Sequence, residues 1–191
     1  MARRGVRRQA EHDWRRLTKE FSNESDRAAA LVAAALLDEN LESLLRAFMV
    51  SDHDDVERLL GTSLQSLGAR LRACYCLGLI SQDEAADLRI VKEVRNHFAH
   101  NLHVSFDDPT VVRSCRRLRM IHRVLPEGVE PSPRRALEQT ACMLSVLLVR
   151  RRLEVGPRRL LIREELSAED MVEQCPLLPD EDRAEQRQEP A

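Results

Sequence analysis

The chain has 191 residues, of which 43% are hydrophobic but only 3% aromatic. This length suits one domain with tails, and the shortage of aromatic residues predicts an aliphatic core that helices build more readily than sheets. No apolar run approaches the roughly 18 residues that span a bilayer, and no apolar stretch follows the basic N-terminus as in a secretion signal. Five cysteines without a Cys-x-x-Cys pair indicate free thiols. We therefore expect a cytoplasmic protein with no membrane contact and no cofactor.

The net charge of -2 conceals opposite charges at the two ends of the chain. Residues 1–22 form a basic N-terminal arm, either a frayed helix or a disordered segment. Trp14 and Phe21 indicate that the end of this arm docks on the domain. Residues 156–191 form an acidic tail that we expect to be disordered. Residues 23–155 between them form the predicted domain.

The first strong helical pattern follows Ser25 and continues to about residue 50, through a stretch rich in leucine and alanine. A short helical turn over residues 55–60 and a helix over residues 63–77 come next. Gly78 ends that helix, because glycine adopts the left-handed conformation at little cost.

Three further helix starts are visible as capping signals. Ser81 and Glu84 form a capping box that begins a helix over residues 82–100, and so short a link predicts an antiparallel hairpin. Asp108 before Pro109 predicts a helix to about Val124, and Ser132 before Pro133 predicts a last long helix. No alternating pattern predicts a strand. The sequence therefore predicts an all-α fold, a compact antiparallel helical bundle.

The stretch RNHFAH, residues 95–100, ends the fourth of these patterns with an arginine on its apolar side. A helical projection places Arg95 with five apolar residues, Leu88, Val91, Val94, Phe98 and Leu102. Burying an unpaired guanidinium costs roughly several kcal/mol, so Arg95 must find a partner or open onto a cleft. One interpretation is structural, with Arg95 paired to Asp38, Glu39 or Glu42 and His100 capping the helix.

A chemical interpretation of the same stretch is also open. Glu93, His97 and His100 have a spacing that suits a metal ion, but no further ligand is evident, so we predict no metal site. The segment resembles the R-x4-H motif of HEPN-type ribonucleases, with Arg95, Asn96 and His100 as catalytic candidates. Histidine would move the proton of a ribose 2′-hydroxyl, and arginine would stabilise charge on the phosphate. Positions i and i+5 diverge by about 140° on a helix, so two motifs would have to meet in a homodimer.

A longer set of segments resembles the mannitol operon repressor family. The segments are DRAAALVAAALLDENLESLLRAFMV, LGARLRACYCLGLISQDEAADLRIVKEVRNHFAHNL and VSFDDPTVVRSC, within roughly residues 24–150. The resemblance implies an all-helical transcription regulator without an obvious helix-turn-helix, and we expect it to be a homodimer. Such a protein would act either by contact with a protein partner or by non-classical binding of DNA. The metal-independent ribonuclease is the alternative function.

The candidate residues for binding nucleic acid are arginines of the last two predicted helices. They are Arg113, Arg116, Arg117, Arg119, Arg123, Arg150, Arg151 and Arg152. The first three share one face of a helix, which suits contacts with phosphates. Such contacts would give affinity without choice of sequence. The competing interpretation is a solvated face that the acidic tail neutralises.

Overall fold

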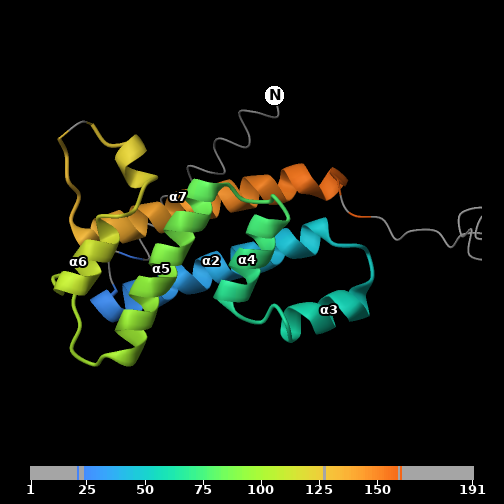
Figure 1. The fold of residues 1–191 in the computed structure, drawn as a ribbon, viewed down its shortest axis with the longest axis horizontal. Helices are drawn as coiled ribbons and strands as arrows, with labels where there is room; N and C mark the ends of the chain where they lie inside the picture. Colours follow the sequence, from blue (N-terminus) through green and yellow to red (C-terminus); the bar gives the residue numbers. More distant parts are fainter. Residues whose placement is uncertain (1–20, 22–23, 127, 159, 161–191) are drawn as a thin grey trace, which may run out of the picture. The chain divides into compact units, whose positions relative to one another are not determined.

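A computed structural model describes residues 21, 24–126, 128–158 and 160 of the chain. These residues form six α-helices and two short 3-10 turns, and no strand occurs among them (Figure 1). The elements are α2 (Asp26–Phe48), α3 (His53–Gly61), α4 (Leu67–Cys76), α5 (Gln82–His100), α6 (Pro109–Cys115), η1 (Ile121–Arg123), α7 (Pro133–Val155) and η2 (Gly156–Arg158). The all-α prediction is confirmed. The basic arm and most of the acidic tail lie outside the described residues.

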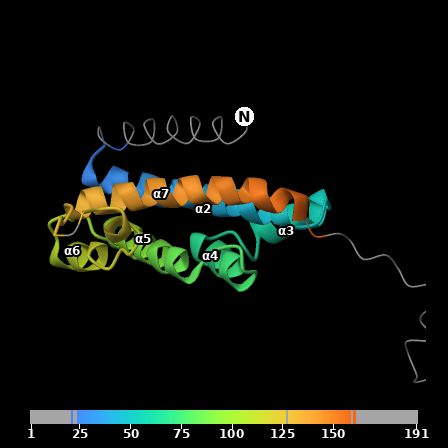
Figure 2. The same cartoon turned by 90° about the horizontal axis from the view of Figure 1, so that it is seen from above.

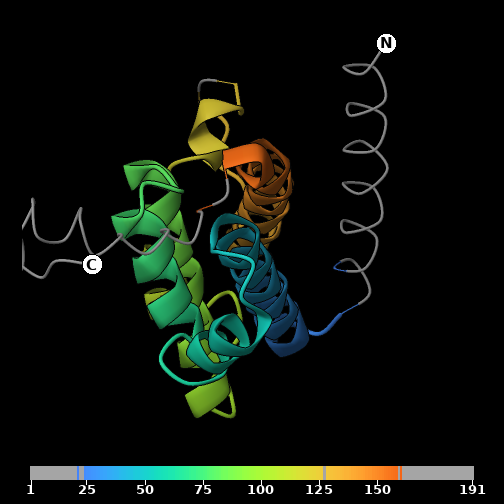
Figure 3. The same cartoon turned by 90° about the vertical axis from the view of Figure 1, so that its right-hand side faces the viewer.

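Helices α2 and α7 lie side by side in one layer, and α4, α5 and α6 cover one side of it (Figures 2 and 3). An ion pair between Arg134 and Asp26 joins the first turns of α7 and α2. The two helices of the layer therefore run in the same direction. Helix α5 runs the opposite way. Arg151 near the end of α7 pairs with Glu84 near the start of α5. The bundle is thus antiparallel around α5 and contains one parallel pair.

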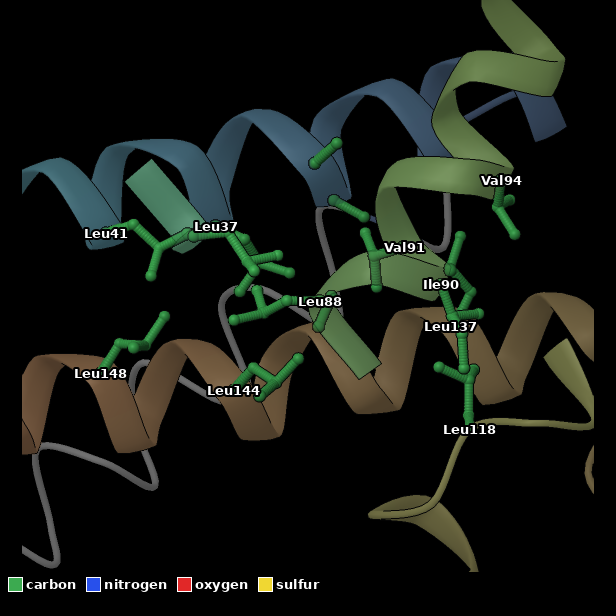
Figure 4. Packing of buried hydrophobic residues seen from close by; sticks show 14 of the residues in the cluster. Leu37, Leu41, Leu88, Ile90, Val91, Val94, Leu118, Leu137, Leu144 and Leu148 are labelled. Atoms are coloured by element: carbon green, nitrogen blue, oxygen red, sulfur yellow. The ribbon is translucent and has the colours of Figure 1, made fainter. Parts of the chain in front are cut away.

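The core lies between these two layers and is almost entirely aliphatic, as the composition predicts. Side chains from α2, α5 and α7 interdigitate there with one from the segment after α6 (Figure 4). The central members are Leu37, Leu41, Leu88, Val91, Leu118, Leu137, Leu144 and Leu148. Each fully buried leucine of this kind stabilises the fold by roughly 1.5–3 kcal/mol relative to an exposed one.

The three predicted capping signals are confirmed by hydrogen bonds at the caps, whereas the helix predicted from residue 63 begins later, at Leu67. Ser81 N–H donates to Glu84 Oε2 over 2.6 Å, and Glu84 N–H donates to Ser81 Oγ over 3.3 Å, which completes the capping box. Asp108 and Ser132 are also N-caps, each with a proline at the start of the helix that follows. Gly78 has a φ of 69°, the left-handed conformation predicted for it.

The helix predicted from Pro109 to Val124 is too long, because α6 ends at Cys115. The carboxylate of Asp87 on α5, which is fully buried, accepts hydrogen bonds from Arg119 N–H at 2.8 Å and Met120 N–H at 2.9 Å. These bonds hold the chain in a turn. The N–H groups of Arg119 and Met120 bond to the Asp87 carboxylate on α5, so they do not bond to backbone oxygens of a longer α6. Consequently Arg117 leaves the helical face predicted for Arg113, Arg116 and Arg117, and only Arg113 and the C-cap Arg116 keep their helical spacing.

The thiols are consistent with the predicted reduced state. Cys74, Cys76 and Cys115 form no disulfide. Burial raises the pKa of the Cys74 and Cys115 thiols to about 12, so both stay protonated and unreactive at neutral pH. Cys175 lies outside the described residues.

Candidate functional site

Arg95 is exposed on the surface of α5, so the prediction that its guanidinium lies among the core residues is wrong. Its Nη1 donates to Oδ1 of the adjacent Asn96 over 3.1 Å. The helical projection from the sequence misplaced both edges of the apolar face of α5. Leu102 lies beyond the end of α5 and is 83% exposed, whereas Ile90, on the opposite edge, is buried. The buried face is therefore centred further from Arg95 than the sequence indicates.

Arg70 of α4 takes the acidic partners predicted for Arg95. Its Nη1 lies 2.8 Å from Asp38 Oδ2, and its Nη2 lies 2.6 Å from Glu42 Oε2. The third predicted partner, Glu39, is exposed. An interhelical ion pair with the carboxylates of α2 therefore exists, but it joins α4 to α2.

We expect Arg95→Ala to leave the free energy of unfolding within about 0.5 kcal/mol of the wild-type value, because the side chain is exposed and, within the described part of the chain, bonds only to its neighbour. Urea denaturation followed by circular dichroism measures this. A loss of roughly 3 kcal/mol would instead indicate a buried ion pair and restore the structural interpretation.

A pocket of about 440 Å³ lies between α5 and α6. Its polar lining includes Asn96, His97, His100, Thr110 and Ser114, and its apolar lining consists of Val94 and Val111. Two of the three predicted catalytic residues, Asn96 and His100, thus share one pocket.

Arg95 is not among the residues that line this pocket, in keeping with the divergence of positions i and i+5 on a helix. The cap predicted for His100 is instead provided by Asn101, whose Nδ2 donates to the backbone oxygen of His97 over 2.9 Å. His100 is exposed and has no structural task of this kind among the described residues. Its imidazole is available to a ligand, but a single chain does not place Arg95 and His100 in one pocket.

His97 and Asp108 meet at the edge of the pocket, a contact that the sequence did not reveal. His97 Nε2 lies 3.4 Å from Asp108 Oδ1, close enough for an ion pair with a protonated imidazole but not aligned as a hydrogen bond. The pKa of Asp108 is lowered by the hydrogen bond from Thr110 N–H, then by that from Val111 N–H and by the charge of His97, against the opposing effect of burial. Asp108 was predicted only as an N-cap, because its distance from His97 depends on the angle between α5 and α6.

Three of the predicted arginines gather around the first turn of α5, where they form ion pairs with two carboxylates. Arg119 Nη1 lies 2.8 Å from one oxygen of Asp83, and Arg123 pairs with the other. The hydrogen bond from Arg119 holds the pKa of Asp83 below its usual range. Arg151 Nη1 lies 2.6 Å from Glu84 Oε2. Burial alone would raise the pKa of Glu84, but the hydrogen bonds from Arg151 and the cap N–H outweigh it and lower that pKa.

The other five predicted arginines fall into two groups. Arg117 Nη1 lies 3.1 Å from Glu93 Oε2, and Arg150 Nε lies 2.9 Å from Glu154 Oε1. The remaining three are exposed and have no carboxylate partner within the described part of the chain: Arg113, Arg116 and Arg152. The neutralising residues thus lie on α5 and α7. The acidic tail, predicted for this task, lies outside the described residues.

Glu84→Gln should reduce the amount of thermal stability that the protein loses as the pH falls. The folded-state pKa of Glu84 is lowered, so its ionised form stabilises the fold above its ordinary pKa of 4.5, and this stabilisation disappears as the pH falls through the folded value. Thermal unfolding between about pH 6 and pH 3 should show a smaller drop for the variant than for the wild type. Glu154→Gln, at an exposed ion pair, is the matched control. Parallel curves for wild type and Glu84→Gln would contradict the assignment.

Comparisons of the chain with protein-family models, with curated proteins and with solved structures find no match. Within the described ranges, no group of three or more histidine, cysteine or acidic side chains could hold a metal ion. The helices of that same part are all too short or too polar to cross a lipid bilayer. The candidate site is therefore defined by its own geometry: an open polar pocket at the end of α5, with the Arg117–Glu93 ion pair at its edge.

Proposed function

We propose that the chain is a cytoplasmic, homodimeric transcription regulator of the kind represented by the mannitol operon repressors, and that it acts by contact with another protein. The observation that carries this choice over DNA binding is the pairing of the arginine surface. Five of its eight arginines are ion-paired with carboxylates of α5 and α7.

Charge balance matters more here than the strength of any pair, since exposed ion pairs contribute only about 0–1 kcal/mol each. The five paired arginines face four carboxylates, Asp83, Glu84, Glu93 and Glu154, so their combined charge is close to +1. A phosphate backbone would have to displace those carboxylates before it gained the arginines. Such a surface attracts DNA far less than eight free arginines would.

The proposal is tested by deleting the gene in the source organism and measuring transcript levels. Deletion should change a defined set of transcripts, and the wild-type chain should restore them. The double variant Arg116→Glu, Arg152→Glu reverses the charge at two of the unpaired arginines. This variant should restore the transcripts as well as the wild-type chain does. Failure of this variant would point to DNA binding, and an unchanged transcript profile on deletion would overturn the regulatory function itself.

A second candidate is a metal-independent ribonuclease, favoured by the exposure of both Arg95 and His100 at the end of α5. Neither side chain is held by the core, and Asn96 bonds to Arg95 while also lining the pocket with His100. A two-fold contact between two α5 ends would bring Arg95 of one copy beside His100 of the other.

This second function predicts cleavage of RNA by the purified protein without added metal. His100→Ala should abolish cleavage, and His103→Ala, which changes another exposed histidine three residues away, should retain it. Equal cleavage by wild type and His100→Ala would exclude the assignment, since a contaminating nuclease would give that result.

A further inference from the structure

The outer side of the α2–α7 layer carries apolar side chains among polar ones such as Glu39 and Arg135, although no other described element covers this side (Figures 2 and 3). Residues 28–37 of α2 read AAALVAAALL, so this part of the helix is apolar all round. A helix that is apolar on every side is normally buried on every side. Val32, however, lies opposite the buried Ala30 and Ala34 and is 38% exposed.

Helix α7 extends this apolar surface. Val146 lies two residues from both Leu144 and Leu148, which are fully buried, and so points to the opposite side of the helix. We define the outer face by six residues that are exposed or half-buried and are not among the side chains packed against the core. They are Ala28, Val32, Ala35, Leu36, Val146 and Val149.

The segment before α2 carries an apolar stripe that could cover this face. Val6, Ala10, Trp14, Leu17 and Phe21 recur at intervals of four, four, three and four residues. At about 100° per residue, all five fall within about 80° of one another on a helix. The last of them, Phe21, is 1% exposed, so one end of the stripe is already buried in the domain.

The chain is also fixed where the outer face begins. Arg134 in the first turn of α7 donates from Nη2 to the backbone oxygens of Phe21, at 2.8 Å, and Glu24, at 2.7 Å. Its Nη1 donates to Asp26 Oδ1 at 2.9 Å. Twenty residues before this anchor would extend about 30 Å as a helix, close to the length of the 23-residue α2.

We propose that residues 1–20 dock on the outer face of the same chain as an amphipathic helix, with Trp14 and Leu17 against α2 and α7. Arg8 and Arg15 then point away from the layer, because they lie opposite the stripe. The arm becomes a fixed part of the fold that presents arginines on the outside of the layer. This inference does not depend on the proposed regulatory function.

Trp14 is the single tryptophan of the chain, so its fluorescence reports on the arm alone. In the full-length protein we expect emission shifted to the blue of that in urea, with little quenching by acrylamide. Val32→Glu on the outer face should move the emission most of the way to the unfolded value and restore quenching. Val124→Glu, which changes a 62% exposed valine that is not part of the outer face, is the control and should change neither.

Leu17→Glu provides a second route, because it lies in the arm and leaves the described helices intact. It should produce the same red shift with unchanged helix content by circular dichroism, even if Val32→Glu fails to fold. Wild-type emission equal to that in urea would overturn the proposal, as would a Leu17→Glu variant with wild-type emission. Protection of Trp14 only at concentrations where sedimentation shows a dimer would assign the cover to a second copy and refute docking within one chain.

Discussion

Asp87→Ala is expected to lower the free energy of unfolding by about 3 kcal/mol. The Asp87 carboxylate is fully buried and accepts the N–H groups of Arg119 and Met120. Alanine would leave two donors without a partner in the turn after α6, and each buried unsatisfied donor costs roughly 1–3 kcal/mol. Burial raises the pKa of Asp87 against the opposing effect of these bonds, so the gain from removing a buried carboxylate offsets only part of the loss.

Urea denaturation followed by far-UV circular dichroism measures this effect. Asp107→Ala, at an exposed position just before α6, is the matched control and should stay within about 0.5 kcal/mol of wild type. Equal midpoints for the two variants would show that the turn does not depend on Asp87.

Arg70→Leu is the second substitution with a large expected effect, a loss of about 2 kcal/mol. The Arg70 side chain is only 12% exposed and bridges Asp38 and Glu42 of α2. Leucine keeps the packing volume but leaves two carboxylates close together without a cation. Because both carboxylates are partly exposed, the loss should be smaller than for a fully buried pair.

The matched control is Arg72→Leu on the same helix, where the arginine is exposed, and its stability should be close to wild type. A double variant Arg70→Leu, Glu42→Leu should recover part of the loss, since it removes one unpaired carboxylate. Equal stability of Arg70→Leu and Arg72→Leu would show that the bridge between α4 and α2 contributes nothing.

The helix starts were predictable because their signals are local. Ser81 and Glu84 satisfy each other's backbone N–H groups, and Asp108 accepts the N–H groups of Thr110 and Val111, all within three residues. The end of α6 was not predictable in the same way. It depends on Asp87, which is 32 residues away from Arg119 in sequence and reaches it only after α5 and α6 have packed.

The candidate site was likewise predictable where its residues lie on one helix, and not where they come from two. Asn96 and His100 share a pocket because one helix carries both, at a spacing the sequence shows. His97 meets Asp108 across two helices, and periodicity contains no information about that distance. Likewise, the sequence predicts an arginine bound to the carboxylates of α2 but does not distinguish Arg70 from Arg95. Which of the two arginines reaches these carboxylates depends on how far each helix is rotated about its own axis when its apolar face is buried.

These differences change how RNHFAH, residues 95–100, is understood. With Arg70 on the carboxylates of α2 and Asn101 at the helix end, Arg95 and His100 have no role in holding the core. The end of α5 is therefore a surface available for contacts. Of the eight arginines that the sequence offered as a DNA surface, on α6, on the segment after it and on α7, five are engaged with carboxylates instead.

The choice between protein contact and DNA binding is tested most directly by titrating labelled duplex DNA with the whole chain at several salt concentrations. We predict that replacing Arg113, Arg116 and Arg152, the three arginines without a carboxylate partner in the described part of the chain, with glutamine leaves any DNA affinity, and its dependence on salt, unchanged. Three phosphate contacts would instead contribute about 3 to the slope of log affinity against log salt. A fall of that size in the triple variant, together with preference of the wild type for one operator sequence, would contradict a regulator that acts through a protein partner.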